Sequence, residues 1–268
     1  MSTNLPLRAF AFDSEQVTAV VTTRHGGVSS GVYGSLNLGG HVGDDPAAVA
    51  ENRRRLAAAL GVGRLTIADQ RHTDRVAIVT PALAGRGHDG IADSAAAFPA
   101  TDAMITAVTG AALAILVADC APVVLFDPVH RVVGVAHSGR AGTLRGVVPK
   151  TVGAMSAAFG TVPGDLLVGI GPAIGAASYE IGPAEAAEVT AAFPSSMTET
   201  RLLTPSRLPG HALFDLTGAI RGQLRAAGIP ADSVHDLEID TRTGTADFFS
   251  DRAARPCGRF AAVALLPA

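Results

Sequence analysis

The chain has 268 residues, 48% hydrophobic and 17% charged, so it can bury a large core and does not have the composition of a disordered protein. Its net charge of −3 and pI near 6.2 indicate no electrostatic surface for nucleic acid or an anionic membrane. It has two cysteines, no secretion signal and no apolar run near the ~20 residues of a membrane span, so we expect a reduced, cytoplasmic protein.

The N-terminal part of the chain predicts a strand, a long loop and a helix. Residues 17–23 are rich in β-branched side chains and predict a strand. The Gly/Ser/Asn-rich loop from Arg24 to Asp45 exceeds the usual loop length, which is typical of functional or disordered loops. Arg24, which precedes two glycines, could hold an anion beside exposed N–H groups; the alternative is an arginine at a turn. Asp45-Pro46 predicts a helix start and Gly61 its end, with the arginines at 53–55 on the solvated side.

The centre of the chain holds three apolar runs, 113–117, 123–126 and 132–136. Asp119 and Cys120 separate the first two, and the third leads into His137. Asp127-Pro128 favours a tight type I turn between the second and third runs. A hairpin closed there would place Cys120 opposite His137 and Val124 opposite Val133, at Cβ separations of about 4.5–5.5 Å. Type I is not the preferred two-residue hairpin turn, and a slip by one residue would put one of the two site residues on the other face.

The remaining elements alternate between helix and strand. His72 lies in a polar loop before a short strand at 76–79, residues 81–99 are predicted to be irregular, and Asp102 directly precedes another apolar strand. Helices are expected at 149–159, 183–193 and 215–227, and strands at 166–170, 234–239 and 260–266. No dinucleotide fingerprint, repeat or linker is present. We therefore expect one compact α/β (α+β) domain spanning 1–268, with mixed sheets packed together and flanking helices.

His72, Cys120 and His137 are the candidate chemical residues. Two imidazoles and a thiolate suit Zn²⁺ or copper, and three protein ligands leave the open position typical of catalytic zinc. A metal there could lower the pKa of a water molecule towards ~7. A second interpretation makes Cys120 a nucleophile with His137 as its base and Asp119 or Asp102 orienting the imidazole. A third makes Cys120 a small buried apolar residue, and spacing alone does not exclude it.

Seven stretches carry a family resemblance, in this order: TTRHGGVSSGVYGSLNLGGHVGDDPAAVAENR (22–53), QRHTDRV (70–76), TDAMIT (101–106), ADCAPVVL (118–125), VAHSGRAGT (135–143), IGPAIGAASYEIG (170–182) and FFSDRAARPCGR (248–259). Together they resemble the YfiH-like family, also known as the multicopper polyphenol oxidase or laccase-domain family, to which a type of purine nucleoside phosphorylase belongs. The resemblance implies an α/β fold with zinc, or copper, bound by a His-Cys-His set that falls on His72, Cys120 and His137.

The chain departs from the family pattern at three positions. The usual HAGWRG becomes HSGRAG at 137–142, so Ala141 takes the place of an arginine and Arg140 adjoins it. Thr73 stands where the family has glycine, and Ser178 where cysteine is common. The metal ligands are kept, and the departures bear on anion binding.

The resemblance implies a zinc-dependent enzyme that acts on purine nucleosides with phosphate. The implied reactions are phosphorolysis of adenosine, inosine, guanosine and methylthioadenosine, and deamination of adenosine. We nominate Arg24, Arg140 and Arg252 to hold phosphate, since arginine binds its oxygens bidentately, and Asp119 or Asp102 as polar support. The alternatives are a copper-dependent polyphenol oxidase, a cysteine or metal hydrolase of peptidoglycan precursors, and a non-catalytic zinc-stabilised binding protein.

Overall fold

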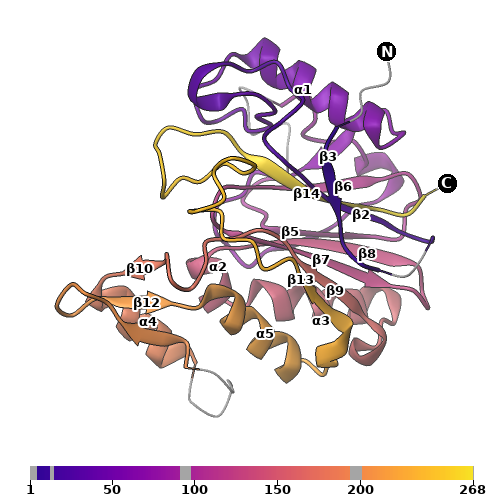
Figure 1. Ribbon diagram of the computed structural model, residues 1–268. Coiled ribbons are helices and arrows are strands. Elements are labelled where there is room, and N and C mark those ends of the chain that lie inside the picture. The colour runs from indigo at the N-terminus through magenta and orange to yellow at the C-terminus, as the bar shows by residue number, and fades with distance from the viewer. Residues whose placement is uncertain (1–4, 13–14, 91–97, 194–200, 268) are drawn as a thin grey trace.

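Two large β-sheets stack face to face, and helices cover the outer face of each (Figure 1). The computed structural model describes residues 5–12, 15–90, 98–193 and 201–267. The five-stranded sheet has the order β1-β2-β14-β6-β3, with bounds Leu7–Ala9, Thr18–Thr22, Phe260–Leu265, Ala112–Val117 and Leu65–Ile67. The six-stranded sheet has the order β13-β9-β7-β8-β5-β4, with bounds Val234–Asp236, Leu167–Ile170, Ala121–Asp127, Val132–Ser138, Ala103–Thr106 and Val76–Ile78.

Helices form the two outer layers. Helix α1 (Pro46–Ala59) lies over the five-stranded sheet, and α3 (Val147–Phe159) and α5 (Leu216–Ala226) lie over the six-stranded sheet (Figure 1). The short α2 (Arg140–Leu144) follows β8 directly. A small third sheet projects from one end beside α4 (Pro183–Ala192), and its order β10-β12-β11 has bounds Glu180–Ile181, Ala212–Phe214 and Leu203–Pro205. The predicted α/β fold with mixed sheets and flanking helices is confirmed.

The apolar runs at the centre of the sequence are strands buried on both faces. In β7, Val123 and Leu125 belong to the core beneath the helices, whereas Val124 and Phe126 belong to the core between the sheets. Successive side chains of a strand point to opposite faces, so a strand covered on both sides must be apolar throughout. This position in the layers explains why the runs show no polar alternation.

The predicted register of the β7–β8 hairpin is wrong by two residues. Val124 pairs with Val135 and His137 pairs with Pro122, so Cys120 precedes the paired region. The connection is a four-residue loop, because the Asp127 carboxylate accepts hydrogen bonds from the N–H groups at 129 and 130 and contacts the His130 ring at 2.9 Å. A shift of two residues keeps each side chain on its face.

The prediction that all three arginines at 53–55 are solvated is wrong for the first of them. Arg53 is 3% exposed, and its guanidinium donates hydrogen bonds to the carbonyl oxygens of Leu38, Gly87 and His88 at 2.8–3.0 Å. Burial lowers its pKa to about 10, so it stays charged at neutral pH. Arg53 therefore ties α1 to two loops that border the site.

Replacement of Arg53 by Met should lower the free energy of unfolding by about 2–4 kcal/mol, because buried carbonyl groups lose their donors. Arg54→Met is the matched control. It removes the same charge from an exposed side chain paired with Glu51, and should leave the free energy of unfolding nearly unchanged. Urea unfolding of both variants measures the difference, and equal losses would show that Arg53 does not hold the loops.

The predicted helices at 46, 149, 183 and 215 are found with ends shifted by a few residues. The three central runs at 113–117, 123–126 and 132–136 are found as longer strands, and the other predicted strands are found with slightly shorter bounds. Short strands β1, β3, β10, β11 and β12 were not predicted, since two or three residues leave no period to detect. Of the segment 81–99, residues 91–97 lie outside the described residues, and the preceding part begins with a turn of 3₁₀ helix at Pro81–Leu83. In the described parts of the chain, no helix is both long and apolar enough to cross a membrane.

Candidate metal centre and its cavity

His72, Cys120 and His137 come together in the structure. Each offers one ligand atom, and these three atoms lie within 4.8 Å of one another. The two imidazole rings have their centroids 4.7 Å apart. His137 is buried, Cys120 is half-buried and His72 is exposed, so the group opens to solvent on one side. The fold thus assembles the residues that the sequence pattern selected.

The three side chains come from three different connections. His72 lies in the loop between β3 and β4, with a left-handed φ of 57°. Cys120 lies in the turn where the chain passes from β6, in the five-stranded sheet, to β7, in the six-stranded sheet. His137 is near the end of β8. The site therefore lies at one end of the stacked sheets, among the loops that connect their strands.

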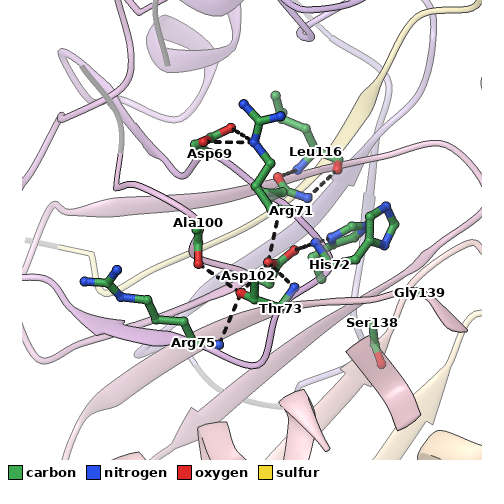
Figure 2. Close-up of polar contacts among 12 residues, drawn as sticks. Asp69, Arg71, His72, Thr73, Arg75, Ala100, Asp102, Leu116, Ser138 and Gly139 are labelled. Carbon is green, nitrogen blue, oxygen red and sulfur yellow. Dashed lines mark hydrogen bonds and ion pairs between the residues drawn. The ribbon is translucent and has the colours of Figure 1, made fainter. Parts of the chain in front are cut away.

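Asp102 forms hydrogen bonds with both His72 and His137, and Figure 2 shows its contact with the His72 segment. Its Oδ1 accepts the backbone N–H of His72 at 3.0 Å and contacts Nδ1 of His137 at 2.8 Å. Its Oδ2 accepts hydrogen bonds from the backbone N–H groups of Arg71 and Thr73 and from the Thr73 hydroxyl. Because Asp102 takes Nδ1 of His137, the remaining ring nitrogen, Nε2, is left for a metal ion, as in carboxylate–histidine–metal arrangements.

Asp119 fixes the turn that carries Cys120. It adopts a left-handed φ of 83°, and its carboxylate accepts hydrogen bonds from the Thr241 hydroxyl at 2.7 Å and the backbone N–H of Arg252 at 2.6 Å. Its carbonyl oxygen accepts the N–H of Ile174. Both carboxylate oxygens thus hold neighbouring loops, which makes Asp119 a positioning residue for Cys120.

The charges of the site shift the pKa values of its histidines when no metal ion is bound. Burial lowers the pKa of His137, but the negative charge on Cys120 and the hydrogen bond with Asp102 outweigh it and raise the pKa to about 9. Burial and the neighbouring His137 lower the pKa of His72. Burial raises the pKa of Asp102, but hydrogen bonds from His137 and Thr73 hold it at about 2. Metal binding must therefore displace a proton from His137.

Because Gly139 has no side chain, the Cys120 and His72 side chains can lie against its backbone. A Cβ atom at this position would lie 2.5 Å from the Cys120 Sγ and 3.0 Å from Nδ1 of His72. Real Cβ atoms do not approach other atoms so closely, so any side chain here must displace the ligands. The glycine of the HSGRAG segment is therefore required by the close approach of the ligands to the backbone.

Gly139→Ala should weaken binding of a metal ion by the three residues about tenfold or more while the protein still folds, because the clash falls on the side chains of Cys120 and His72. Gly153→Ala in α3 is the control, since its Cβ would meet no atom within 4 Å. That exposed helical substitution should stabilise the protein by about 0.5–1 kcal/mol. Zinc titration with a chromophoric chelator measures both, and unchanged affinity in Gly139→Ala would contradict the geometry.

A cavity of about 550 Å³ opens at the ligand group, within the size range of small-molecule sites. Its two walls come from different layers of the fold. One is built from the long loop, α1 and Arg259, which directly precedes β14, and the other from α2, α5 and the loop before β10. Of the described residues, six arginines and three aspartates line it, against a net charge of −3 for the whole chain. The cavity thus concentrates positive charge beside the candidate metal centre.

The three nominated arginines lie in different surroundings. Arg140 lines the cavity and forms an ion pair with Glu188 of α4. Arg252 also lines it, with its guanidinium 5.2 Å from the centre of the Tyr179 ring and a hydrogen bond to the carbonyl oxygen of Glu180. Arg24 is not among the described residues that line the cavity; it donates to the carbonyl oxygens of Gly34 and Thr245 and holds the long loop in place.

Sequence reasoning missed several residues of this cavity. His41, Arg71, Tyr179 and Arg259 all line it. Arg71 directly precedes a predicted ligand, which is a signal that the sequence offered. His41 and Arg259 lie within the family-like stretches 22–53 and 248–259, but these stretches are far apart in the chain and only the fold brings them to one cavity.

Residues 18–267 match the family model described as multi-copper polyphenol oxidoreductase laccase. The chain belongs to this laccase family. Its relatives include a purine nucleoside phosphorylase of Streptomyces griseus, 42% identical over 90% of this chain and 90% of that protein. A purine nucleoside phosphorylase of Mycobacterium tuberculosis is 39% identical, over 93% of this chain and 92% of its own length.

Solved structures of laccase-family members share the fold. YlmD of Geobacillus stearothermophilus superposes with a TM-score of 0.89 at 35% identity, covering 97% of each chain. YfiH of Bacillus licheniformis gives a TM-score of 0.90 at 31% identity, covering 97% of this chain and 99% of its own. The resemblance inferred from the sequence motifs is confirmed.

The residues present fit a single transition-metal ion. Two imidazoles and a thiolate match the donors of zinc sites, and a carboxylate orients one imidazole through its second nitrogen. Within the ranges that the structure describes, this is the one group of three or more His, Cys, Asp or Glu side chains placed to hold a metal. The donor set therefore suits one ion with an open position.

Proposed function

We propose that this protein is a zinc-dependent enzyme of purine nucleosides. Its reactions are the phosphorolysis of adenosine, inosine, guanosine and methylthioadenosine and the deamination of adenosine, in the cytoplasm. The observation that carries the proposal is the His72–Cys120–His137 group, which opens into a nucleoside-sized cavity rich in arginine. Relatives of about 40% identity that bear the name purine nucleoside phosphorylase support the substrate class.

His72, Cys120 and His137 would hold the zinc ion. When bound, zinc acts as a Lewis acid and lowers the pKa of a coordinated water molecule. Asp102 keeps the His137 ring in one orientation and one tautomer through the 2.8 Å contact at Nδ1. Asp119 keeps the Cys120 turn in place. These residues preorganise the centre, so that the ligands need not move when a substrate arrives.

In phosphorolysis, an oxygen of phosphate forms a bond to C1′ of the ribose while the C1′–N9 bond breaks and the purine leaves with a proton. Arg140 and Arg252 line the cavity and would hold the phosphate against C1′. Arginine suits this task because its planar guanidinium binds two phosphate oxygens at once. Arg24 does not line the cavity and instead donates hydrogen bonds that hold the long loop. We therefore assign phosphate binding to Arg140 and Arg252.

A copper-dependent polyphenol oxidase is the second candidate, because the matching family model carries the description multi-copper. A multicopper enzyme needs several copper ions, and the described residues hold a single suitable group. Oxygen consumption with catechol and copper-loaded protein tests this candidate. Nucleoside turnover by zinc-loaded protein without oxygen uptake favours the purine enzyme.

Chromatography of adenosine incubated with zinc-loaded protein, with and without phosphate, tests the proposed function. Adenine that forms only with phosphate, or inosine that forms without it, is the expected result. Absence of both products at every metal loading would overturn the proposal. Such a result would favour the hydrolase of peptidoglycan precursors or, with metal-dependent melting alone, a zinc-stabilised binding protein.

A further inference from the structure

One wall of the cavity carries a group of basic side chains that the proposed phosphorolysis does not use. We name this group the basic wall, and it consists of His41, Arg53, Arg71 and Arg259. Its members come from the long loop, α1, the β3–β4 loop and the residue before β14. Arg140 and Arg252, which were assigned to phosphate, have other neighbours: Arg140 pairs with Glu188 of α4, and Arg252 contacts Tyr179 and the Glu180 carbonyl oxygen.

Two members of the basic wall have free hydrogen-bond donors. Arg71 contacts Asp69 through Nε at 2.9 Å, and in the described part of the chain its two Nη groups have no hydrogen-bond acceptor. Figure 2 shows this guanidinium beside Asp69, on the side of the loop away from Asp102. The His41 ring likewise makes no hydrogen bond to any described residue. Both can therefore donate to a ligand in the cavity.

The other two members contribute charge. Arg53 donates its hydrogen bonds to carbonyl oxygens of neighbouring loops, and no described carboxylate forms an ion pair with it. Arg259 donates to the carbonyl oxygens of Cys257 and Gly258 and forms a long ion pair with Asp251 at 3.4 Å. Arg53 therefore adds a positive charge without a described carboxylate partner beside the free donors, and Arg259 adds one that Asp251 partly compensates.

The electrostatic effect of this arrangement is visible at His41. Burial lowers the pKa of His41, and the positive charges of Arg259, Arg53 and Arg71 lower it further, against a smaller opposite effect of Asp69. His41 is therefore a neutral donor near pH 7. Surroundings that disfavour a positive charge on His41 favour a negatively charged ligand beside it. Gly40 and Gly87 line the same wall, where backbone can approach a ligand without a side chain between them.

We propose that the basic wall is a second phosphate subsite, in which Arg71 and His41 donate hydrogen bonds and Arg53 and Arg259 supply charge. The proposal rests on the proposed function and narrows its substrate class to a purine nucleoside that carries its own phosphate, such as AMP. Two groups of basic residues then serve two phosphates. Phosphorolysis of AMP breaks C1′–N9, forms C1′–O to inorganic phosphate, and yields adenine and ribose 1,5-bisphosphate.

Calorimetric titration of the zinc-loaded protein with adenosine, AMP and inorganic phosphate tests the subsite. AMP should bind about tenfold more tightly than adenosine, as expected for charge-assisted hydrogen bonds at a partly exposed site. Arg71→Met should remove this advantage and leave the affinity for adenosine unchanged, and His41→Asn should reduce it. Arg64→Met is the matched control, because Arg64 is equally exposed, pairs with Asp89 and does not line the cavity.

The outcomes separate the subsite from the proposed function. Equal binding of AMP to the native protein and to Arg71→Met, with phosphate binding also unchanged, would overturn the subsite. Loss of inorganic phosphate binding in Arg71→Met, without any preference for AMP over adenosine, would keep the subsite and overturn the assignment of AMP. Arg71-dependent binding of AMP by a protein that converts neither compound would support the subsite and refute the proposed function.

Discussion

Cys120→Ala should abolish both zinc binding and nucleoside turnover while the fold is retained. Among the described residues, Cys120 is one of three that are placed to hold a metal ion, and alanine offers no donor atom in its place. Cys120 is half-buried and packs at the edge of the core between the sheets, so the metal-free variant should lose only about 1 kcal/mol of unfolding free energy. The expected metal content falls from about one ion per chain to none.

Thermal melting gives a second measurement that does not depend on turnover. A metal that binds only the folded state stabilises it by about 2.7 kcal/mol at a hundredfold excess over its dissociation constant. Zinc should therefore raise the melting temperature of the native protein and not that of Cys120→Ala.

Cys257→Ala is the control for loss of a thiol, because Cys257 is buried away from the ligand group and should leave zinc binding intact. Retained zinc and turnover in Cys120→Ala would show that Cys120 is neither a ligand nor a nucleophile.

Asp102→Asn should weaken zinc binding by about 10–100-fold, because the carboxylate that orients His137 becomes an amide. The side chain is fully buried and accepts hydrogen bonds on both oxygens. An amide nitrogen cannot accept the donors on its side, so the free energy of unfolding should also fall by about 2–4 kcal/mol. Zinc titration and urea unfolding measure the two effects.

The same variant should change the acid limb of the stability profile. The pKa of Asp102 is lowered to about 2 in the folded protein, so the ionised carboxylate stabilises the fold above its unfolded pKa near 3.8. This contribution, about 2 kcal/mol, is lost as the pH falls from 4 through 2. Asp102→Asn lacks a titrating group and should lose this part of the pH dependence.

Asp127→Asn is the control that shows whether Asp102 positions His137 for metal binding or only stabilises the fold. Asp127 is equally buried and accepts several hydrogen bonds, but it lies at the other end of β7 from Cys120. Its amide variant should also be destabilised, yet should bind zinc like the native protein. If both variants lose zinc affinity equally, Asp102 acts only through overall stability.

The sequence by itself determined the elements and the donor set. The apolar runs at 123–126 and 132–136, joined by the turn at Asp127-Pro128, predicted a hairpin, and Asp45-Pro46 predicted a helix start, because these signals arise from neighbouring residues. The choice of His72, Cys120 and His137 also came from the sequence, through ligand chemistry and the family motifs around them. Their proximity in the structure agrees with that choice.

Only the tertiary structure decided which distant side chains share a wall. Three arginines stand together at 53–55, yet only the fold shows that the first is buried against carbonyl groups from two loops. Arg24 and Arg71 each lie beside a conspicuous motif, yet only Arg71 lines the cavity. The hairpin register likewise depended on the contacts that Asp127 makes with its loop. Local patterns decide helix and strand, whereas burial and charge partners arise from segments far apart in the chain, which the packing of the two sheets brings together.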